Sequence, residues 1–440
     1  MRVHPGQVLA RIVAWTRRWQ AILPLLAAEL IVWLGFGALL PVMPLYFTAH
    51  GVELQTLGVV VAAWPAARLI GEPIFGWLAD RTRRVPLMVI GNISAGVFMF
   101  LPLVFVGVVP FSILRAAAGL ATAMYDPAAR GYITDATPPD RRGEAFGMYG
   151  AAQMGGLLLG PAIGGVGASV FGGVAFIFVF GALATFLAAA AIAIRVREQP
   201  HAVGERSRPL ELTEMGGQPD HLQARSARAS EGGDAASDSP AAAPASLVNR
   251  WLISAILFTI GGSFAFGTYE VIWSLYLQRL GAGLELIGFT FAMFALPILV
   301  LSPWFGRRVD RSSLTPFLVA GTSLPVAAAL AYTVIRDPLL SVPLILVEST
   351  GAAVGGPAVY TVIASGSPVG RSSTAQGIVG ASGTLAFVVA SLAAGAAAGI
   401  DIRLPFYLFA VVMSVVSGAA FVVGWPRLRE RAATMAAAPA

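Results

Sequence analysis

The chain lacks cysteine and lysine and has only four histidines in 440 residues. Without cysteine there is no disulfide bond, no thiolate metal site and no cysteine nucleophile. The histidines lie outside the apolar segments and none is spaced as a metal-binding pair; they are His4, His50, His201 and His221. We therefore expect no metal, no cofactor and no catalytic residues, and the chain is not predicted to be an enzyme.

Charge is also scarce along this chain. Charged residues make up 12% and hydrophobic residues 57%, against about 25% and 45–50% in soluble domains. The apolar residues form continuous runs of about 20 residues, each long enough to cross a bilayer. Continuous runs, without alternation of polar and apolar residues, predict spanning helices and argue against a β-barrel. The predicted fold class is an all-α integral membrane protein.

The apolar runs number twelve and divide into two sets of six. The first set covers 21–47, 56–79, 85–109, 111–134, 145–169 and 173–194, and the second covers 251–278, 286–306, 314–335, 338–364, 375–399 and 403–425. Residues 195–249 between them are rich in Ala, Ser, Gly, Pro, Asp and Arg, a composition that cannot form a core. The predicted organisation is a cytoplasmic N-terminal segment (1–20), an N-terminal half (21–194), a cytoplasmic disordered linker (195–249), a C-terminal half (250–426) and a cytoplasmic tail (427–440).

The distribution of arginine predicts the orientation. All 29 basic residues are arginines, and 23 of them lie at the termini, in the linker and in alternate loops. The loops on the other side carry only Arg279, Arg336 and Arg403. Because arginine concentrates on the cytoplasmic side, we expect a multi-pass plasma (inner) membrane protein with both termini cytoplasmic. The same bias explains the net charge of +6 without a nucleic-acid partner.

An internal repeat relates the two halves. Adding 230 to a residue number in the first half repeatedly gives the same residue type in the second half. Among these matches are Gly37 and Gly267, Tyr46 and Tyr276, Gly51 and Gly281, Gly58 and Gly288, and Gly165 and Gly395. One ungapped offset over some 130 residues indicates two homologous, pseudo-symmetric six-helix halves. Such halves enclose the substrate path between them.

The loop after the second apolar run carries a recognisable motif. It reads Gly76-Trp-Leu-Ala-Asp80-Arg81-Thr-Arg83-Arg84, with a reduced copy at Gly306, Asp310 and Arg311. The motif, repeated at the same place in both halves, resembles the signature of the major facilitator superfamily, although Arg83 stands where that family usually has glycine. The resemblance implies a gating latch in which Asp80 accepts hydrogen bonds at a helix N-terminus. The arginines would bind lipid phosphates or an acid such as Asp135. The alternative is that these charges only anchor the loop in the cytoplasm.

The fourth apolar run contains Arg115, followed by Gly119. The pair resembles a second motif of the superfamily, and the resemblance implies a part for Arg115 in proton transfer. A guanidinium within the membrane costs about 3 kcal/mol on insertion scales unless it is paired or hydrated, so an acid is expected to face it. The alternative is an arginine that extends to the outer interface.

The fifth apolar run resembles the motif of the superfamily's drug/proton antiporters. The residues concerned are Gly156, Gly160, Pro161, Gly164 and Gly165. Glycines four residues apart form a smooth face for close helix approach, and the proline frees a backbone carbonyl. The resemblance favours export by antiport over uptake, whereas a pure packing face is the alternative.

Eight charged residues lie within the apolar runs. The acids are Glu29, Glu72, Asp126, Glu270 and Glu348, and the bases are Arg68, Arg115 and Arg130. Spacing of four residues predicts local ion pairs of Arg68 with Glu72 and of Asp126 with Arg130. The remaining three acids, Glu29, Glu270 and Glu348, then have Arg115 as the one basic residue left to balance them. Such carboxyl groups must be protonated, face water or bind a cation. All of these charged residues except Arg130 are therefore candidates for proton coupling or substrate binding, and Glu29 and Glu348 are the deepest of them.

We therefore predict a twelve-helix, proton-coupled exporter of small amphipathic molecules that works by alternating access. Its expected partners are a small-molecule substrate, protons and membrane lipids, and the expected oligomeric state is a monomer. The alternatives are a metabolite uniporter or symporter, a carrier of lipid-linked substrates, and a receptor that keeps the fold without transporting.

Overall fold

The computed structural model describes residues 14–138, 141–171, 173–198, 249–309, 311–366 and 372–437. Within these ranges the regular structure is helical throughout. Eleven helices are long and apolar enough to cross a membrane, and α2 with α3 forms a bent pair that brings the number to twelve. The structure therefore confirms the all-α membrane fold. The predicted disordered linker lies mostly outside the described residues.

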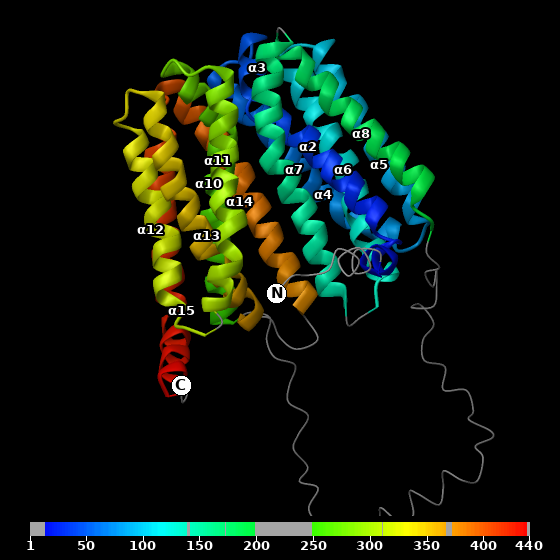
Figure 1. The fold of residues 1–440 in the computed structure, drawn as a ribbon. Helices are drawn as coiled ribbons and strands as arrows, with labels where there is room; N and C mark the ends of the chain where they lie inside the picture. Colours follow the sequence, from blue (N-terminus) through cyan, green and yellow to red (C-terminus); the bar gives the residue numbers. More distant parts are fainter. Residues whose placement is uncertain are drawn as a thin grey trace, which may run out of the picture.

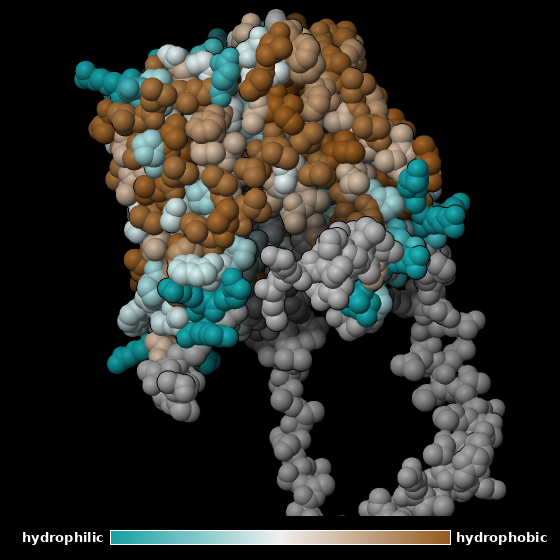
Figure 2. All heavy atoms as spheres, in the orientation of Figure 1, coloured by the Kyte–Doolittle hydropathy of each residue, from teal (hydrophilic) through white to brown (hydrophobic). Residues whose placement is uncertain are grey.

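The helices follow each other up and down in two groups (Figure 1). The first group is α2 (Leu23–Leu39), α3 (Met43–Ala49), α4 (Leu54–Ala79), α5 (Arg84–Phe100), α6 (Val108–Ala136), α7 (Arg142–Val170) and α8 (Ala175–Arg195). The second is α10 (Arg250–Arg279), α11 (Leu284–Val309), α12 (Thr315–Tyr332), α13 (Ser341–Gly366), α14 (Ser372–Ile400) and α15 (Leu404–Ala437). On the face shown in Figure 2, hydrophobic side chains form a broad band between hydrophilic residues near the two ends, as contact with a bilayer requires.

The first predicted span is broken in the structure. Residues 21–47 were expected as one helix, but α2 and α3 meet at an angle of 43°. Pro41 lies in the break and Pro44 in the first turn of α3. Proline has no N–H to donate and clashes with the preceding turn, so the chain bends here although its hydropathy is continuous.

The internal repeat extends to individual contacts. The Tyr46 hydroxyl donates to the Pro102 carbonyl at 3.1 Å, and the Tyr276 hydroxyl donates to the Tyr332 carbonyl. Donor and acceptor are each displaced by 230 residues. Each bond ties the end of the first span of a half to the end of its third span, so the two halves use the same interhelical bond.

The turns after these spans also repeat. Gly51 and Gly281 adopt φ angles of 87° and 91°, a region that only glycine enters at little cost. Both follow the last turn of their helix. The offset of 230 therefore matches the backbone conformation as well as the residue type.

The two halves share a core at one end only. We call the end with loop 80–83 and residue Arg311 the motif end, and the end with the turns at Gly51 and Gly281 the opposite end. At the opposite end one apolar cluster takes residues from both halves, such as Phe47 and Phe406. At the motif end the described apolar clusters each belong to a single half. The halves are thus joined at the opposite end and packed separately at the motif end.

Glycines from the repeat bring the two halves into backbone contact at the opposite end. Gly58 of α4 faces Gly395 of α14, where an added Cβ at Gly395 would lie 2.6 Å from the Gly58 nitrogen. Gly165 of α7 faces Gly288 of α11, where an added Cβ at Gly288 would lie 3.2 Å from the Gly165 Cα. Adding 230 converts one contact into the other. The halves therefore meet through two equivalent contacts that have no room for a larger residue.

Candidate functional site

An ion pair joins the two halves within the membrane. Arg115 Nη2 of α6 donates to Glu270 Oε1 of α10 at 2.8 Å, and their side chains are 8% and 14% exposed. The same nitrogen lies 3.3 Å from the Val61 carbonyl of α4. The sequence required an acid near Arg115, and the fold supplies it from a residue 155 positions away.

A small cavity of about 40 Å³ in the N-terminal half reaches Arg115. Trp64, Leu114 and Thr122 also line it. A water molecule needs on the order of 10–15 Å³ in this measure, so a few waters fit. Small-molecule sites occupy about 300–1,000 Å³, so in this conformation the cavity admits water and no drug-sized ligand.

A second group of charges connects α4 and α6. Arg68 binds Glu72 at 2.5 Å, as its spacing predicted, and also binds the Asp126 carboxylate. Arg130 lies 3.9 Å from Glu72 and donates to the backbone carbonyl of Asp126 at 3.3 Å. The expected Asp126–Arg130 ion pair is therefore not the one that forms. Packing of α4 against α6 lets the two carboxylates share Arg68 instead, and the group contains two positive and two negative charges.

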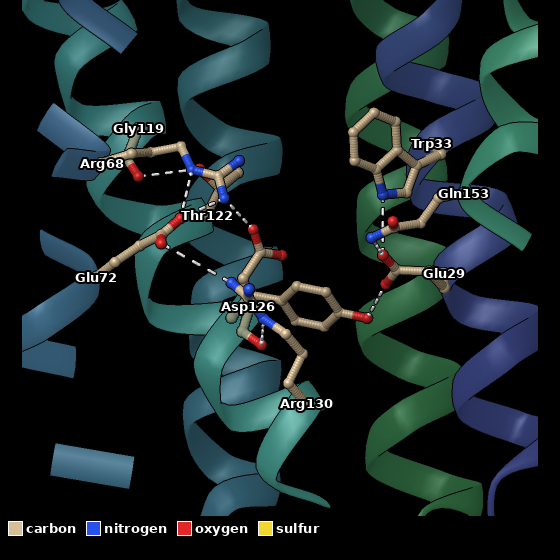
Figure 3. A network of polar contacts seen from close by, with 10 residues as sticks. Glu29, Trp33, Arg68, Glu72, Gly119, Thr122, Asp126, Arg130 and Gln153 are labelled. Atoms are coloured by element: carbon tan, nitrogen blue, oxygen red, sulfur yellow. Dashed lines mark hydrogen bonds and ion pairs between the residues drawn. The ribbon is translucent and has the colours of Figure 1, made fainter. Parts of the chain in front are cut away.

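Glu29 of α2 lies beside this group and is fully buried (Figure 3). Its Oε1 accepts hydrogen bonds from Trp33 Nε1 at 2.9 Å and from Gln153 Nε2 at 2.7 Å. Its Oε2 accepts from the Tyr125 hydroxyl at 2.5 Å. No described arginine forms an ion pair with it. Three hydrogen-bond donors from three helices therefore hold a carboxyl group that has no cation.

Glu348 of α13 is a buried acid of the C-terminal half, with 4% exposure, at a position that the offset of 230 does not relate to Glu29. The Tyr332 hydroxyl donates to its Oε2 at 3.0 Å. Aromatic rings surround this contact: Trp273 lies 4.9 Å and Phe406 5.5 Å from the Tyr332 ring. As with Glu29, no ion pair to a described arginine compensates this carboxyl group.

The motif loop is built around a buried arginine. Arg84 Nη1 lies 2.6 Å from Asp135, and its Nη2 lies 3.5 Å from Asp80. Glu198, after the end of α8, accepts the backbone N–H groups of Arg84 and Val85 at 2.9 and 3.0 Å. A carboxylate at a helix N-terminus satisfies free N–H groups and the helix dipole. Asp80 is 78% exposed at its side chain, and Glu198 takes the place at the start of α5 that the sequence suggested for Asp80.

The motif glycines have the same surroundings in both halves. A Cβ added at Gly76 would lie 3.8 Å from the Pro127 Cβ, and one added at Gly306 would lie 3.9 Å from the Pro357 Cβ. The prolines again differ by 230. Arg81 stacks over the Trp77 ring at 4.0 Å, and Arg311 is exposed. Asp310, also predicted for this motif, lies outside the described residues.

The glycines of α7 pack mainly within their own half. An added Cβ at Gly156, Gly160 or Gly164 would lie within 2.8 Å of α2 backbone or side-chain atoms. Only the last turns reach the C-terminal half, where Gly165 meets α11 and the Pro161 carbonyl would lie 2.4 Å from a Cβ at Gly288. The motif therefore provides a packing face and, at its end, an interface between the halves.

Several polar partners were not predicted from the sequence. Trp33 is four residues from Glu29, a spacing that already places both on one helix face. Tyr125, Gln153 and Tyr332 carry no comparable local signal, because they reach the acids from other helices. Glu198 follows the last apolar residues of α8, where its sequence context suggested only a linker.

The chain belongs to the major facilitator superfamily. The family model described as Major Facilitator Superfamily matches residues 25–269 and again 252–438. The two matches cover the two halves that the repeat and the contacts define. Members of this family transport solutes across membranes, so the class of protein is a membrane transporter.

Two curated relatives are named as resistance proteins. The chain is 32% identical to the quinolone resistance protein NorA of Staphylococcus aureus (strain MRSA252) over 140 residues, 32% of this chain and 36% of that one. It is 31% identical to multidrug resistance protein 2 of Bacillus subtilis (strain 168) over 175 residues, 39% and 40% of the two chains. These matches thus span well under half the length of either relative.

Solved structures share the fold over nearly the whole chain. A bacterial homolog of the human lysosomal transporter Spinster superimposes with a TM-score of 0.70 and 15% identity, covering 92% of this chain and 96% of that one. The nucleoside transporter NupG gives 0.69 and 12%, covering 91% and 99%. At these identities the likeness shows a common fold.

Proposed function

We propose that this protein exports small amphipathic molecules, cationic ones in particular, across the plasma membrane in exchange for protons. The observation that carries the proposal is the pair of buried acids, Glu29 and Glu348, which have no cation partner among the described residues. The partial relatives are named for resistance to quinolones and to multiple drugs, which supports drug-like substrates and export.

Charge balance around Glu29 supports a titrating role. Arg68 and Arg130 already balance Glu72 and Asp126, so an ionised Glu29 would leave one uncompensated negative charge. A buried charge without a partner is strongly unfavourable. Glu29 therefore needs either a proton or an external cation. Competition between these two is the simplest mechanism of exchange.

The donors around Glu29 define where its proton resides. Oε1 already accepts hydrogen bonds from two N–H groups. Neither nitrogen can act as an acceptor, so a proton on Oε1 would have no partner there. Oε2 faces the Tyr125 hydroxyl, which can either donate or accept. Protonation thus occurs on Oε2, and Tyr125 changes from donor to acceptor when it happens.

The unequal ends of the molecule support alternating access. The halves share one apolar cluster at the opposite end and have separate clusters at the motif end. This is the arrangement of a carrier that is closed at the opposite end. The glycine contacts of α4 with α14 and of α7 with α11 would have to separate for that end to open. The arginine distribution assigns the motif end to the cytoplasm.

Everted membrane vesicles test this function. With an imposed proton gradient, acidic inside, wild-type vesicles should accumulate the lipophilic cation ethidium, and a protonophore should abolish the accumulation. Vesicles without the protein provide the background. Equilibration that ignores the gradient would contradict antiport and favour the uniporter alternative, whereas no uptake of any cationic probe would contradict the substrate class.

A further inference from the structure

A basic cleft lies at the motif end of α11. It is open to the surface, has a volume of about 520 Å³ and is lined by Trp304, Arg307, Arg308, Arg311 and Ser312. The Arg308 guanidinium stacks over the Trp304 ring at 4.0 Å from its centroid. Stacking fixes the plane of the guanidinium while its N–H groups remain free at the edge. The cleft is unrelated to the buried acids of the proposed transport mechanism.

An apolar stripe on α11 leads directly into this cleft. Leu296, Val300 and Trp304 are spaced by four residues, so they lie on one helix face that continues to Arg308. All three side chains are exposed, at 39%, 60% and 43%. In a membrane protein an exposed apolar face contacts acyl chains, and a tryptophan at its end marks the level of the headgroups. The arginines therefore lie at headgroup level below a lipid-facing stripe.

Within the part of the chain that the structure describes, no acidic side chain neutralises the charge of the cleft. No carboxylate among the described residues forms an ion pair with Arg307, Arg308 or Arg311, and all three are exposed. Even with the neighbouring Asp310 counted from the sequence, the local side-chain charge is +2. An external anion is the complementary ligand.

Comparison with the other half shows why these arginines are free. In the N-terminal half the buried Arg84 guanidinium pairs with Asp135, and Glu198 accepts the Arg84 backbone N–H. Adding 230 gives Leu314 and Leu428, which are each 1% exposed and belong to one apolar cluster. The C-terminal half therefore packs this region with leucines, and among the residues that the structure describes there is no counterpart of the Arg84 ion pairs.

We propose that this cleft binds the phosphate of an anionic glycerophospholipid, whose acyl chain lies along Leu296 and Val300. Arginine N–H groups bind phosphate oxygens in a bidentate manner. An anionic lipid carries a net negative charge that complements the arginines, whereas a zwitterionic lipid is neutral overall. The apolar stripe distinguishes a lipid from a free phosphate ion, because only a lipid gains from both parts of the site.

Lipid binding to the delipidated full-length protein, measured by native mass spectrometry, tests the site. Wild type should retain phosphatidylglycerol in preference to phosphatidylcholine, and inorganic phosphate should not displace it. The double variant Arg307→Gln/Arg308→Gln should lose roughly 25-fold in phosphatidylglycerol affinity, at about fivefold for each arginine near the surface. Arg307→Lys/Arg308→Lys should recover part of the loss, since it restores the charge without the bidentate geometry.

The control is Arg81→Gln/Arg83→Gln, in loop 80–83 at the motif end of the N-terminal half, where Arg83 already lies 3.9 Å from the Glu198 carboxylate. It removes the same charge, including an arginine that stacks on a tryptophan at the same 4.0 Å. Affinity should fall much less in the control. An equal loss in both variants would show a general surface charge effect and overturn the proposal. Displacement of the lipid by inorganic phosphate, or equal retention of the two lipids by wild type, would overturn it as well.

Discussion

The Arg115 guanidinium of the N-terminal half lies 2.8 Å from the Glu270 carboxylate of the C-terminal half. Among the described residues this is the only ion pair that crosses between the halves. It lies towards the opposite end, about ten residues or 15 Å along α10 from the turn at Gly281. In the proposed alternating-access cycle, opening of that end would separate the two side chains. The ion pair can therefore form only in the conformation in which the opposite end is closed.

Removing one partner of this pair should destabilise the protein more than removing both. Arg115→Leu or Glu270→Leu alone leaves a buried charge, at a cost of about 3–5 kcal/mol, whereas the double variant Arg115→Leu/Glu270→Leu leaves none. Melting temperatures of the purified variants measure this, with the exposed Arg336→Leu as the control. Single variants as stable as wild type would show that the pair is not formed.

Neutralising the buried acids should uncouple transport from protons. Glutamine at Glu29 reproduces the protonated side chain, because its amide can donate to Tyr125 while its oxygen accepts from Trp33. Glu29→Gln and Glu348→Gln should each allow substrate exchange but lose uphill efflux in everted vesicles. The exposed Glu53→Gln should transport normally. Undiminished gradient-driven efflux by both buried variants would remove the carboxyl mechanism.

A side chain at the glycine contacts should hold the opposite end open. A Cβ at Gly58 would lie 2.1 Å from the Ser391 carbonyl oxygen, and one at Gly288 would lie 2.4 Å from the Pro161 oxygen. Overpacking of this kind costs about 1–3 kcal/mol, which shifts the equilibrium between conformations by roughly 5- to 150-fold.

The cysteine-free chain permits a direct measurement of this shift. The labelling rate of a single Leu54→Cys, next to the contact, should rise in Gly58→Ala and Gly288→Ala. Gly262→Ala is the matched control, because an added Cβ there meets nothing within 4 Å. Equal labelling rates in all variants would contradict a role for these contacts in closure.

Substitutions in the motif loop should separate folding from transport. Asp135→Asn should lower the melting temperature, because Arg84 is buried and loses its 2.6 Å partner, a charge-assisted bond worth about 1.5–3 kcal/mol. Asp80→Asn should leave the melting temperature nearly unchanged, since the side chain is exposed here, but should reduce transport. Asp310→Asn should matter less, because that copy of the motif is reduced. Normal transport by Asp80→Asn would leave only an anchoring role.

Reporter fusions should place the motif end in the cytoplasm. A reporter inserted after Ser230 should report a cytoplasmic location. A reporter inserted after Gly283 should report a periplasmic location. Short deletions within 210–240 should leave transport intact. The reverse pattern of reporter activity would contradict the orientation inferred from arginine, and with it the direction of export.

The sequence by itself determined the features that depend on local chemistry and on the repeat. Hydropathy gave the twelve spans because burial in a bilayer acts on each segment separately. The offset of 230 predicted two equivalent halves, and the spacing of Arg68 and Glu72 predicted their contact, because residues four apart share a helix face.

Only the tertiary structure decided which charges meet and where the halves join. Arg115 finds Glu270 across 155 residues, and Glu29 takes its donors from α6 and α7 as well as from its own helix. Helix periodicity sets the face on which a residue lies but does not fix the neighbouring helix or its depth. Those depend on close packing at glycines such as Gly58 and Gly165, whose identity is visible in the sequence but whose partners are set by the fold.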